Sequence, residues 1–140
     1  MTRVVKGIAA VLLSLSTLGP HADAPSGAAT VETLLKEVVT GLYDAIAEHR
    51  LEQAIRFYHS NSPEIARARA EIELSQAAYL QKTLTLSFAY TGRREDLALG
   101  TARHHFLRIA GVKFFEDIAE VSYVFRKEGG AWKLWTSRVQ

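Results

Sequence analysis

The sequence contains no cysteine among its 140 residues. This absence excludes a disulfide framework, a thiolate zinc site, a cysteine nucleophile and a lipid-modified cysteine anchor. It does not argue against export, because a domain of this size buries enough apolar surface to fold without covalent cross-links.

The sequence also lacks a strong excess of charge of either sign. The chain carries 17 Lys and Arg against 15 Asp and Glu, which gives a formal net charge of +2. Arg3 and Lys6 lie in the first residues, so the rest of the chain is close to neutral. The basic residues are scattered among glutamates, a pattern typical of a solvated mixed surface. We therefore predict no nucleic-acid partner.

Long hydrophobic runs are missing apart from one segment near the start. Residues 7–18 form an apolar stretch of 12 residues that follows Arg3 and Lys6. As a helix it would span about 18 Å, which is short of the ~30 Å hydrocarbon core of a bilayer. We predict no stable membrane anchor and interpret the segment as part of a secretory signal peptide. A buried N-terminal core helix is the alternative.

The expected cleavage site follows a helix-breaking Gly19-Pro20. Residues 22–24 (Ala-Asp-Ala) give the small-x-small pattern that signal peptidase recognises. Residues 1–24 are therefore the predicted signal peptide, and the protein is predicted to be periplasmic or secreted. Because Pro25 is a poor neighbour for cleavage, a cut after Ala28 or Ala29 is the alternative.

The remaining chain is predicted to be a flexible lead-in over residues 25–30 and one domain over residues 31–140. Apolar residues recur at helical spacing from Val31 to Ile46, which predicts a long helix. Leu51 to Tyr58 predict a short helix. Ser62-Pro63 is a cap followed by proline at the first helical position, and a third helix is predicted to run to about Leu80.

The apolar period changes to two after Lys82. Leu84, Leu86, Phe88 and Tyr90 are predicted to face the core, and Thr83, Thr85, Ser87 and Thr91 the other side. Further strands are predicted over residues 97–109, 114–127 and 131–139, with a hairpin turn at 128–130. Helices followed by an antiparallel meander predict an α+β domain with three N-terminal helices packed on one face of a four-stranded sheet.

Three segments carry a resemblance to a known superfamily. They are the helix pair LYDAIAEHRLEQAIRFYHSNSP, the strand beginning at Leu97-Ala98, and the terminal hairpin VSYVFRKEGGAWKLWTSRV. Over about residues 31–139 the chain resembles the nuclear transport factor 2-like superfamily, which includes the SnoaL-like polyketide cyclases and ketosteroid isomerases. The resemblance implies a curved sheet wrapped around the first helix, with an apolar pocket at the open end of a cone. Small residues at Ala98, Gly100 and Ala102 fit a concave strand face.

The resemblance also implies a role for two tyrosines. Tyr43 falls where ketosteroid isomerases place an oxyanion-holding tyrosine, and Tyr58 falls at another pocket-lining tyrosine. A phenol aimed into an apolar pocket polarises a carbonyl effectively because water is excluded. The alternative is that both only pack. The chain departs from the isomerases at the catalytic base, since residues 59–63 contain no Asp, and at the later acid, which falls near Ile118 or Ala119.

Asp117 is the remaining acid of interest. Regular alternation would place it on one face with Ala119, Val121 and Tyr123, where desolvation raises the pKa of an unpaired carboxyl. With His104 on the neighbouring strand it would form an acid/base pair. The alternative is that Asp117 lies near water or pairs with an arginine. The predicted catalytic set is Tyr43, His104 and Asp117, and the predicted pocket lining is Tyr58, Phe88, Ala102, Phe106 and Tyr123.

Two further features are interpreted conservatively. His104 and His105 are adjacent in a strand and face opposite ways, so they cannot chelate one ion, and we predict no metal and no cofactor. His59 is predicted to be a solvated loop residue. The polar strip that begins at Thr83, with Arg103 and His105, is predicted either to form a homodimer interface or to face solvent.

The sequence is compatible with three functions. The first is an exported domain that binds a small apolar ligand without catalysis. The second is an enzyme of the isomerase, cyclase or lyase kind that uses the predicted catalytic set. The third is an assembly module that forms a homodimer or docks into an envelope complex.

Overall fold

The computed structural model describes residues 29–111 and 115–140. Val31–Gln140 form a compact unit of their own. The predicted signal peptide and most of the predicted lead-in lie outside the described residues. Among the described residues, no helix is both long and apolar enough to cross a membrane.

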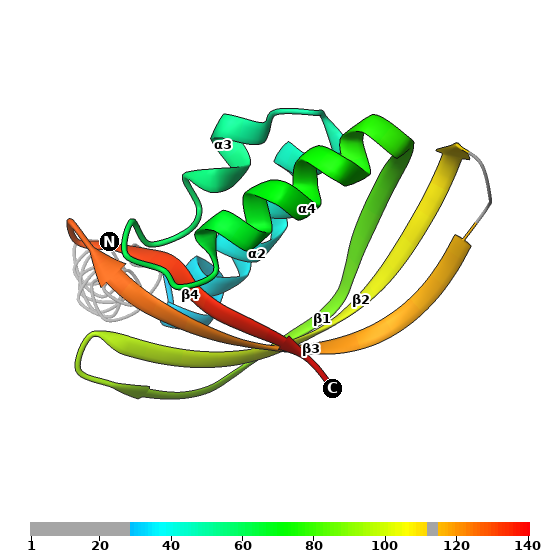
Figure 1. Ribbon diagram of the computed structural model, residues 1–140. Helices are drawn as coiled ribbons and strands as arrows, with labels where there is room; N and C mark the ends of the chain where they lie inside the picture. The colour runs from blue at the N-terminus through cyan, green and yellow to red at the C-terminus, as the bar shows by residue number, and fades with distance from the viewer. Residues whose placement is uncertain (1–28, 112–114) are drawn as a thin grey trace, which may run out of the picture. The chain divides into compact units, whose positions relative to one another are not determined.

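Three helices lie over one face of the sheet (Figure 1). They are α2 (Val31–Ala47), α3 (Leu51–Ile55) and α4 (Ile65–Ala78). The long helix forms as predicted because its apolar stripe is buried, with Leu35 and Val39 fully inaccessible to solvent. It ends where His49 adopts a left-handed φ of 59° and the Arg50 N–H donates to the Ala45 carbonyl at 2.9 Å.

The sheet is an antiparallel meander in the order β1-β2-β3-β4. Its strands are β1 (Tyr79–Arg94), β2 (Leu97–Gly111), β3 (Phe115–Glu128) and β4 (Ala131–Val139). The strands bend around the helices, so the sheet has a concave inner face and a convex outer face (Figure 1). The prediction of an α+β domain with three helices and a curved four-stranded sheet is confirmed.

Strand β1 begins earlier in the chain than the sequence predicted. It begins at Tyr79, where the sequence predicted the last turn of a helix, and it continues to Arg94. The hairpin turn is therefore only Glu95 and Asp96, because Arg94 already pairs with Leu97. Pairing with β2 along its whole length holds these extra residues in the sheet.

The prediction of which β1 residues face inward is wrong for the first half of the strand. Thr83 pairs with Phe106 and Thr85 with His104, and both of these partners face inward. A β-bulge between Thr85 and Ser87 inserts one extra residue and reverses the alternation, so only from Phe88 onward does the predicted face turn inward. Leu84 and Leu86 are consequently 41% and 51% exposed.

The small residues of β2 make room for packed side chains and do not line a cavity. Ala98 and Ala102 are fully buried, and the Phe88 ring covers Gly100 so closely that a Cβ there would lie 2.5 Å from its Cζ. Glycine is required at this position by the close approach of that ring. The Phe88 ring in turn contacts Phe125 edge-on at 6.3 Å between centroids.

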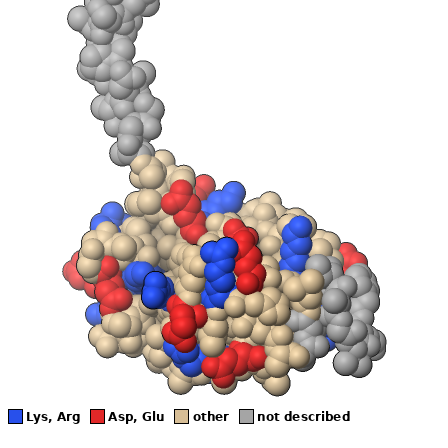
Figure 2. All heavy atoms as spheres, turned by 90° about the horizontal axis from the view of Figure 1, so that it is seen from above, with Lys and Arg blue, Asp and Glu red and all other residues tan. Residues whose placement is uncertain are grey.

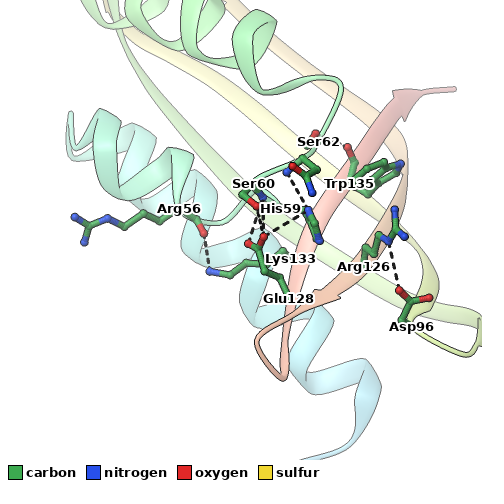
Figure 3. A network of polar contacts seen from close by, with 10 residues as sticks. Arg56, His59, Ser60, Ser62, Asp96, Arg126, Glu128, Lys133 and Trp135 are labelled. Carbon is green, nitrogen blue, oxygen red and sulfur yellow. Dashed lines mark hydrogen bonds and ion pairs between the residues drawn. The ribbon is translucent and has the colours of Figure 1, made fainter.

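The loop between α3 and α4 is fixed to the β3–β4 hairpin (Figure 3). The Ser60 N–H and hydroxyl both donate to the Glu128 carboxylate, and the Ser62 hydroxyl donates to the Trp135 carbonyl at 2.6 Å. His59 is only 7% exposed, and its ring meets Trp135 edge-on at 5.2 Å. The prediction that His59 is solvated is therefore wrong, because the loop adds to the edge of β4 through the His59 N–H and the Leu134 carbonyl.

Candidate functional site

A cavity of about 590 Å³ lies between α2, α4 and the sheet. Its wall comprises Leu42, Tyr43, Ile46, Tyr58, Arg67, Ala68, Glu71, Ile72, Ser75, Gln81, Phe106, Val121, Ser137, Arg138 and Val139. The volume is in the range of small-molecule sites, and the wall mixes apolar side chains with polar and charged ones.

The charged residues of the wall are largely balanced. Arg67 lies 3.3 Å from a Glu64 carboxylate oxygen and 3.7 Å from one of Glu71, and all three side chains come from one end of α4 or just before it. The same balance holds over the helical face as a whole, where Figure 2 shows basic and acidic side chains interleaved. Arg67 therefore adds little net positive charge to the wall, and Arg138 is the other basic residue that lines it.

A chain of hydrogen bonds leads from the cavity wall into the core. The Tyr43 hydroxyl lies 3.3 Å from the Tyr123 hydroxyl. The Tyr123 hydroxyl lies 2.7 Å from His104 Nε2, and His104 Nδ1 lies 3.1 Å from the Thr85 hydroxyl. His104 is completely buried, so this relay of four side chains (Tyr43, Tyr123, His104 and Thr85) meets the cavity only at Tyr43.

Burial keeps every member of the relay uncharged at neutral pH. Desolvation lowers the pKa of His104 to about 4, so its imidazole is neutral. Desolvation also raises the pKa of Tyr43, which the hydrogen bond with Tyr123 partly offsets. It likewise raises the pKa values of Tyr123 and Tyr58 well above that of a free phenol. The relay can therefore exchange hydrogen-bond direction but carries no net charge.

Aromatic packing fixes the relay in place. The Tyr43 ring lies 4.9 Å from the His104 ring and 5.8 Å from the Phe106 ring. The ring centroid of Phe106 also lies 5.5 Å from that of His104. The bulge in β1 completes the arrangement because it turns Thr85 inward to face His104.

The structure brings together part of the predicted residue set. Tyr43, Tyr58 and Phe106 line the cavity. His104 and Tyr123 lie directly behind Tyr43, joined to it by the relay. Phe88 and Ala102 belong to the packed core and are not among the described residues that line the cavity.

Asp117 lies apart from the other two predicted catalytic residues. It occupies the predicted inner face, since it pairs in register with Phe106, but its position near the start of β3 leaves it exposed to solvent. Within the described part of the chain it has no hydrogen bond to His104 or Tyr43. The carboxyl is therefore in contact with solvent and not buried among apolar side chains.

Sequence reasoning missed Thr85 and the cavity-lining residues of α4. Thr85 was assigned to the outer face because no sequence signal marks the bulge. Arg67, Ala68, Glu71, Ile72 and Ser75 face the cavity at helical spacing, and this i, i+4 pattern of mixed polarity was the only signal available.

The structure describes no metal centre. Among the described residues, no group of three or more His, Asp and Glu side chains lies close enough to hold an ion. His105 faces outward and pairs with Glu116, with 2.6 Å between Nε2 and Oε1. It therefore points away from the buried His104, as the strand alternation predicted.

Comparison with known proteins identifies the fold. No protein-family model and no curated protein matches the sequence. Solved structures do match, among them a candidate dehydratase of the nuclear transport factor 2-like family from Streptomyces avermitilis. That match has a TM-score of 0.63 at 15% identity and covers 76% of this chain and 92% of the other. The domain has the nuclear transport factor 2-like fold.

Two further matches extend the comparison. A nuclear transport factor 2-like superfamily protein from Salmonella enterica aligns with a TM-score of 0.63 at 11% identity, over 76% of this chain and 87% of its own. A candidate aromatic ring hydroxylase from Novosphingobium aromaticivorans aligns with a TM-score of 0.68 at 12% identity, over 76% of this chain and 85% of its own. At these identities the nuclear transport factor 2-like fold is what is shared.

Proposed function

We propose that the domain binds a small, largely apolar molecule in the cavity between α2, α4 and the sheet, and that it does so after export. The observation that carries the proposal is a cavity of about 590 Å³ whose wall combines apolar side chains with Tyr43, which is held by an uncharged buried relay. Such a wall removes apolar ligand surface from water and fixes one polar group of the ligand.

Binding is favoured over catalysis by the position of the ionisable groups. Some structural neighbours are described as a candidate dehydratase and a candidate hydroxylase. General acid/base chemistry requires a group near its pKa within hydrogen-bond reach of the reacting atom. Here the His104 pKa is lowered to about 4, and its side chain lies behind Tyr123, away from the cavity. Asp117 is exposed and forms no hydrogen bond with His104 or Tyr43 within the described part of the chain.

Binding is tested with an apolar probe panel and a cavity-filling variant. Val121→Phe inserts a ring at the cavity wall, whereas Val124→Phe places the same ring three residues along β3, at a position that does not line the cavity. We expect micromolar probe binding by calorimetry to the wild type and to Val124→Phe, and at least tenfold weaker binding to Val121→Phe. If no probe binds the folded wild type or raises its melting temperature, the proposal is overturned.

A second function is favoured by the outer face of the sheet. Five large apolar side chains are exposed on it: Leu84, Leu86, Leu97, Leu99 and Ile118, the last two at 47% and 48%. The same face carries both signs of charge, with Arg103 directly opposite Glu120 in the register. A face that carries apolar side chains and both charges complements itself under a twofold axis, so we propose a second copy of this chain as its partner.

Self-association is tested by sedimentation of the wild type and two variants. Leu86→Glu places a charge in the proposed interface, and Leu74→Glu places the same charge on α4, where Leu74 is 71% exposed. We expect a dimer for the wild type and Leu74→Glu, and a monomer for Leu86→Glu. A wild type that stays monomeric at high concentration contradicts this function.

A further inference from the structure

We propose that the inner end of the cavity recognises a single uncharged oxygen of its ligand, and that His104 is a positioning residue whose tautomer decides whether Tyr43 donates or accepts there. The inference rests on the proposed binding function and goes beyond it, because it names the polar group of the ligand and the residue that selects it. It follows from counting hydrogens along the relay.

One arrangement makes Tyr43 a donor. A neutral imidazole has one N–H and one bare nitrogen. If Nε2 carries the hydrogen, it donates to the Tyr123 oxygen 2.7 Å away. Tyr123 then donates to the Tyr43 oxygen, which leaves the Tyr43 hydrogen available to a ligand in the cavity that Tyr43 lines. The bare Nδ1 accepts from the Thr85 hydroxyl at 3.1 Å. This arrangement suits a ligand carbonyl.

The opposite arrangement makes Tyr43 an acceptor. If Nδ1 carries the hydrogen, it donates to Thr85, and Nε2 accepts from Tyr123. Tyr123 then accepts from Tyr43, whose remaining lone pair faces the cavity. This arrangement suits a ligand hydroxyl that donates. Each relay bond allows both directions, so the ligand and the buried ring select the arrangement together.

The charge of the wall indicates that the recognised oxygen is uncharged. Tyr43 stands in apolar surroundings beside Phe106 and His104, which stays neutral because burial lowers its pKa to about 4. A buried carboxylate needs a cation, and the wall arginine on α4, Arg67, is already paired with Glu64 and Glu71. Arg138 also borders the cavity. It pairs in register with Ser122, which lies on the outer face of the sheet, so the register places Arg138 on that outer face as well. A ketone or an alcohol therefore fits this end better than an acid.

The test uses four naphthalene derivatives of similar shape and the ¹⁵N spectrum of the histidines. Acetylnaphthalene can only accept a hydrogen bond, whereas the naphthol hydroxyl can donate one. Isopropylnaphthalene forms no hydrogen bond, and naphthoate carries a negative charge. We expect His104 to carry its hydrogen on Nε2 in the acetylnaphthalene complex and on Nδ1 in the naphthol complex. We also expect Tyr43→Phe to weaken the binding of acetylnaphthalene about tenfold and to leave the binding of isopropylnaphthalene unchanged. The same variant is expected to abolish the difference in His104 tautomer between the acetylnaphthalene and naphthol complexes.

The possible outcomes separate this inference from the function on which it rests. If probes bind but His104 shows the same tautomer with acetylnaphthalene and naphthol, or if naphthoate binds most tightly, the inference is overturned while the cavity is retained as a binding site. If none of the four probes binds the folded protein, both are overturned. If His104 had a purely structural role, its tautomer would not change with the bound ligand.

Discussion

Acidification from pH 7 to pH 4 is expected to destabilise the folded domain by up to about 3 kcal/mol through His104 alone. Burial lowers the pKa of His104 from 6.5 to about 4 in the folded state. Between these values the unfolded chain binds a proton that the folded chain does not, so stability is complete above pH 6.5 and falls as the pH drops toward 4. The groups that face His104 are Tyr43, Tyr123, Thr85 and Phe106, and none of them supplies a negative charge.

Urea unfolding at several pH values measures this effect. His104→Gln removes the titrating ring, and His105→Gln removes a neighbouring ring that faces outward toward Glu116. We expect the difference in unfolding free energy between pH 7 and pH 4 to shrink in His104→Gln and to stay close to wild type in His105→Gln. Equal pH dependence in all three proteins would show that His104 is not buried as a neutral ring.

Truncation of Leu35 is expected to lower the free energy of unfolding by about 2–5 kcal/mol. Leu35 is completely buried where α2 packs against the sheet, and Leu35→Ala leaves an unfilled space there. The adjacent Leu34 is 37% exposed, so Leu34→Ala provides a matched control with an expected loss below about 1 kcal/mol. Chemical denaturation of both variants measures the difference. Equal losses would contradict the packing of α2 on the concave face.

The parts of the fold that the sequence predicted are those with strong local periodicity. The apolar stripe of α2 was predicted correctly because its helical period is uninterrupted. The bounds of β4 were also predicted correctly, because buried Trp132 and Leu134 alternate with more exposed residues at its start, before a register shift at Trp135. The β3–β4 turn was predicted from Gly129-Gly130, and both glycines have positive φ, 58° and 79°. Local signals of this kind do not depend on distant partners.

The parts that the sequence did not predict depend on distant contacts. Thr85 was assigned to the wrong face because the bulge before Ser87 is set by pairing with β2. The burial of His59 depends on Trp135 in β4. The exposure of Asp117 depends on which helices cover the start of β3. In each case the decisive neighbour lies far away in the sequence.

The candidate site shows the same division. Tyr43 and Tyr58 were selected from a resemblance, and both line the cavity. The link from Tyr43 through Tyr123 to His104 could not be inferred from the chain, because it joins α2, β3 and β2. The hydrogen-bond relay is therefore a product of the sheet register, which brings Tyr123 and His104 onto one concave face.

A crystal structure of the domain bound to acetylnaphthalene tests the central claim most directly. The account predicts the probe in the cavity between α2, α4 and the sheet, with its carbonyl oxygen within hydrogen-bond distance of the Tyr43 hydroxyl. A space filled by the domain's own side chains, or a probe held elsewhere with Tyr43 untouched, would contradict it.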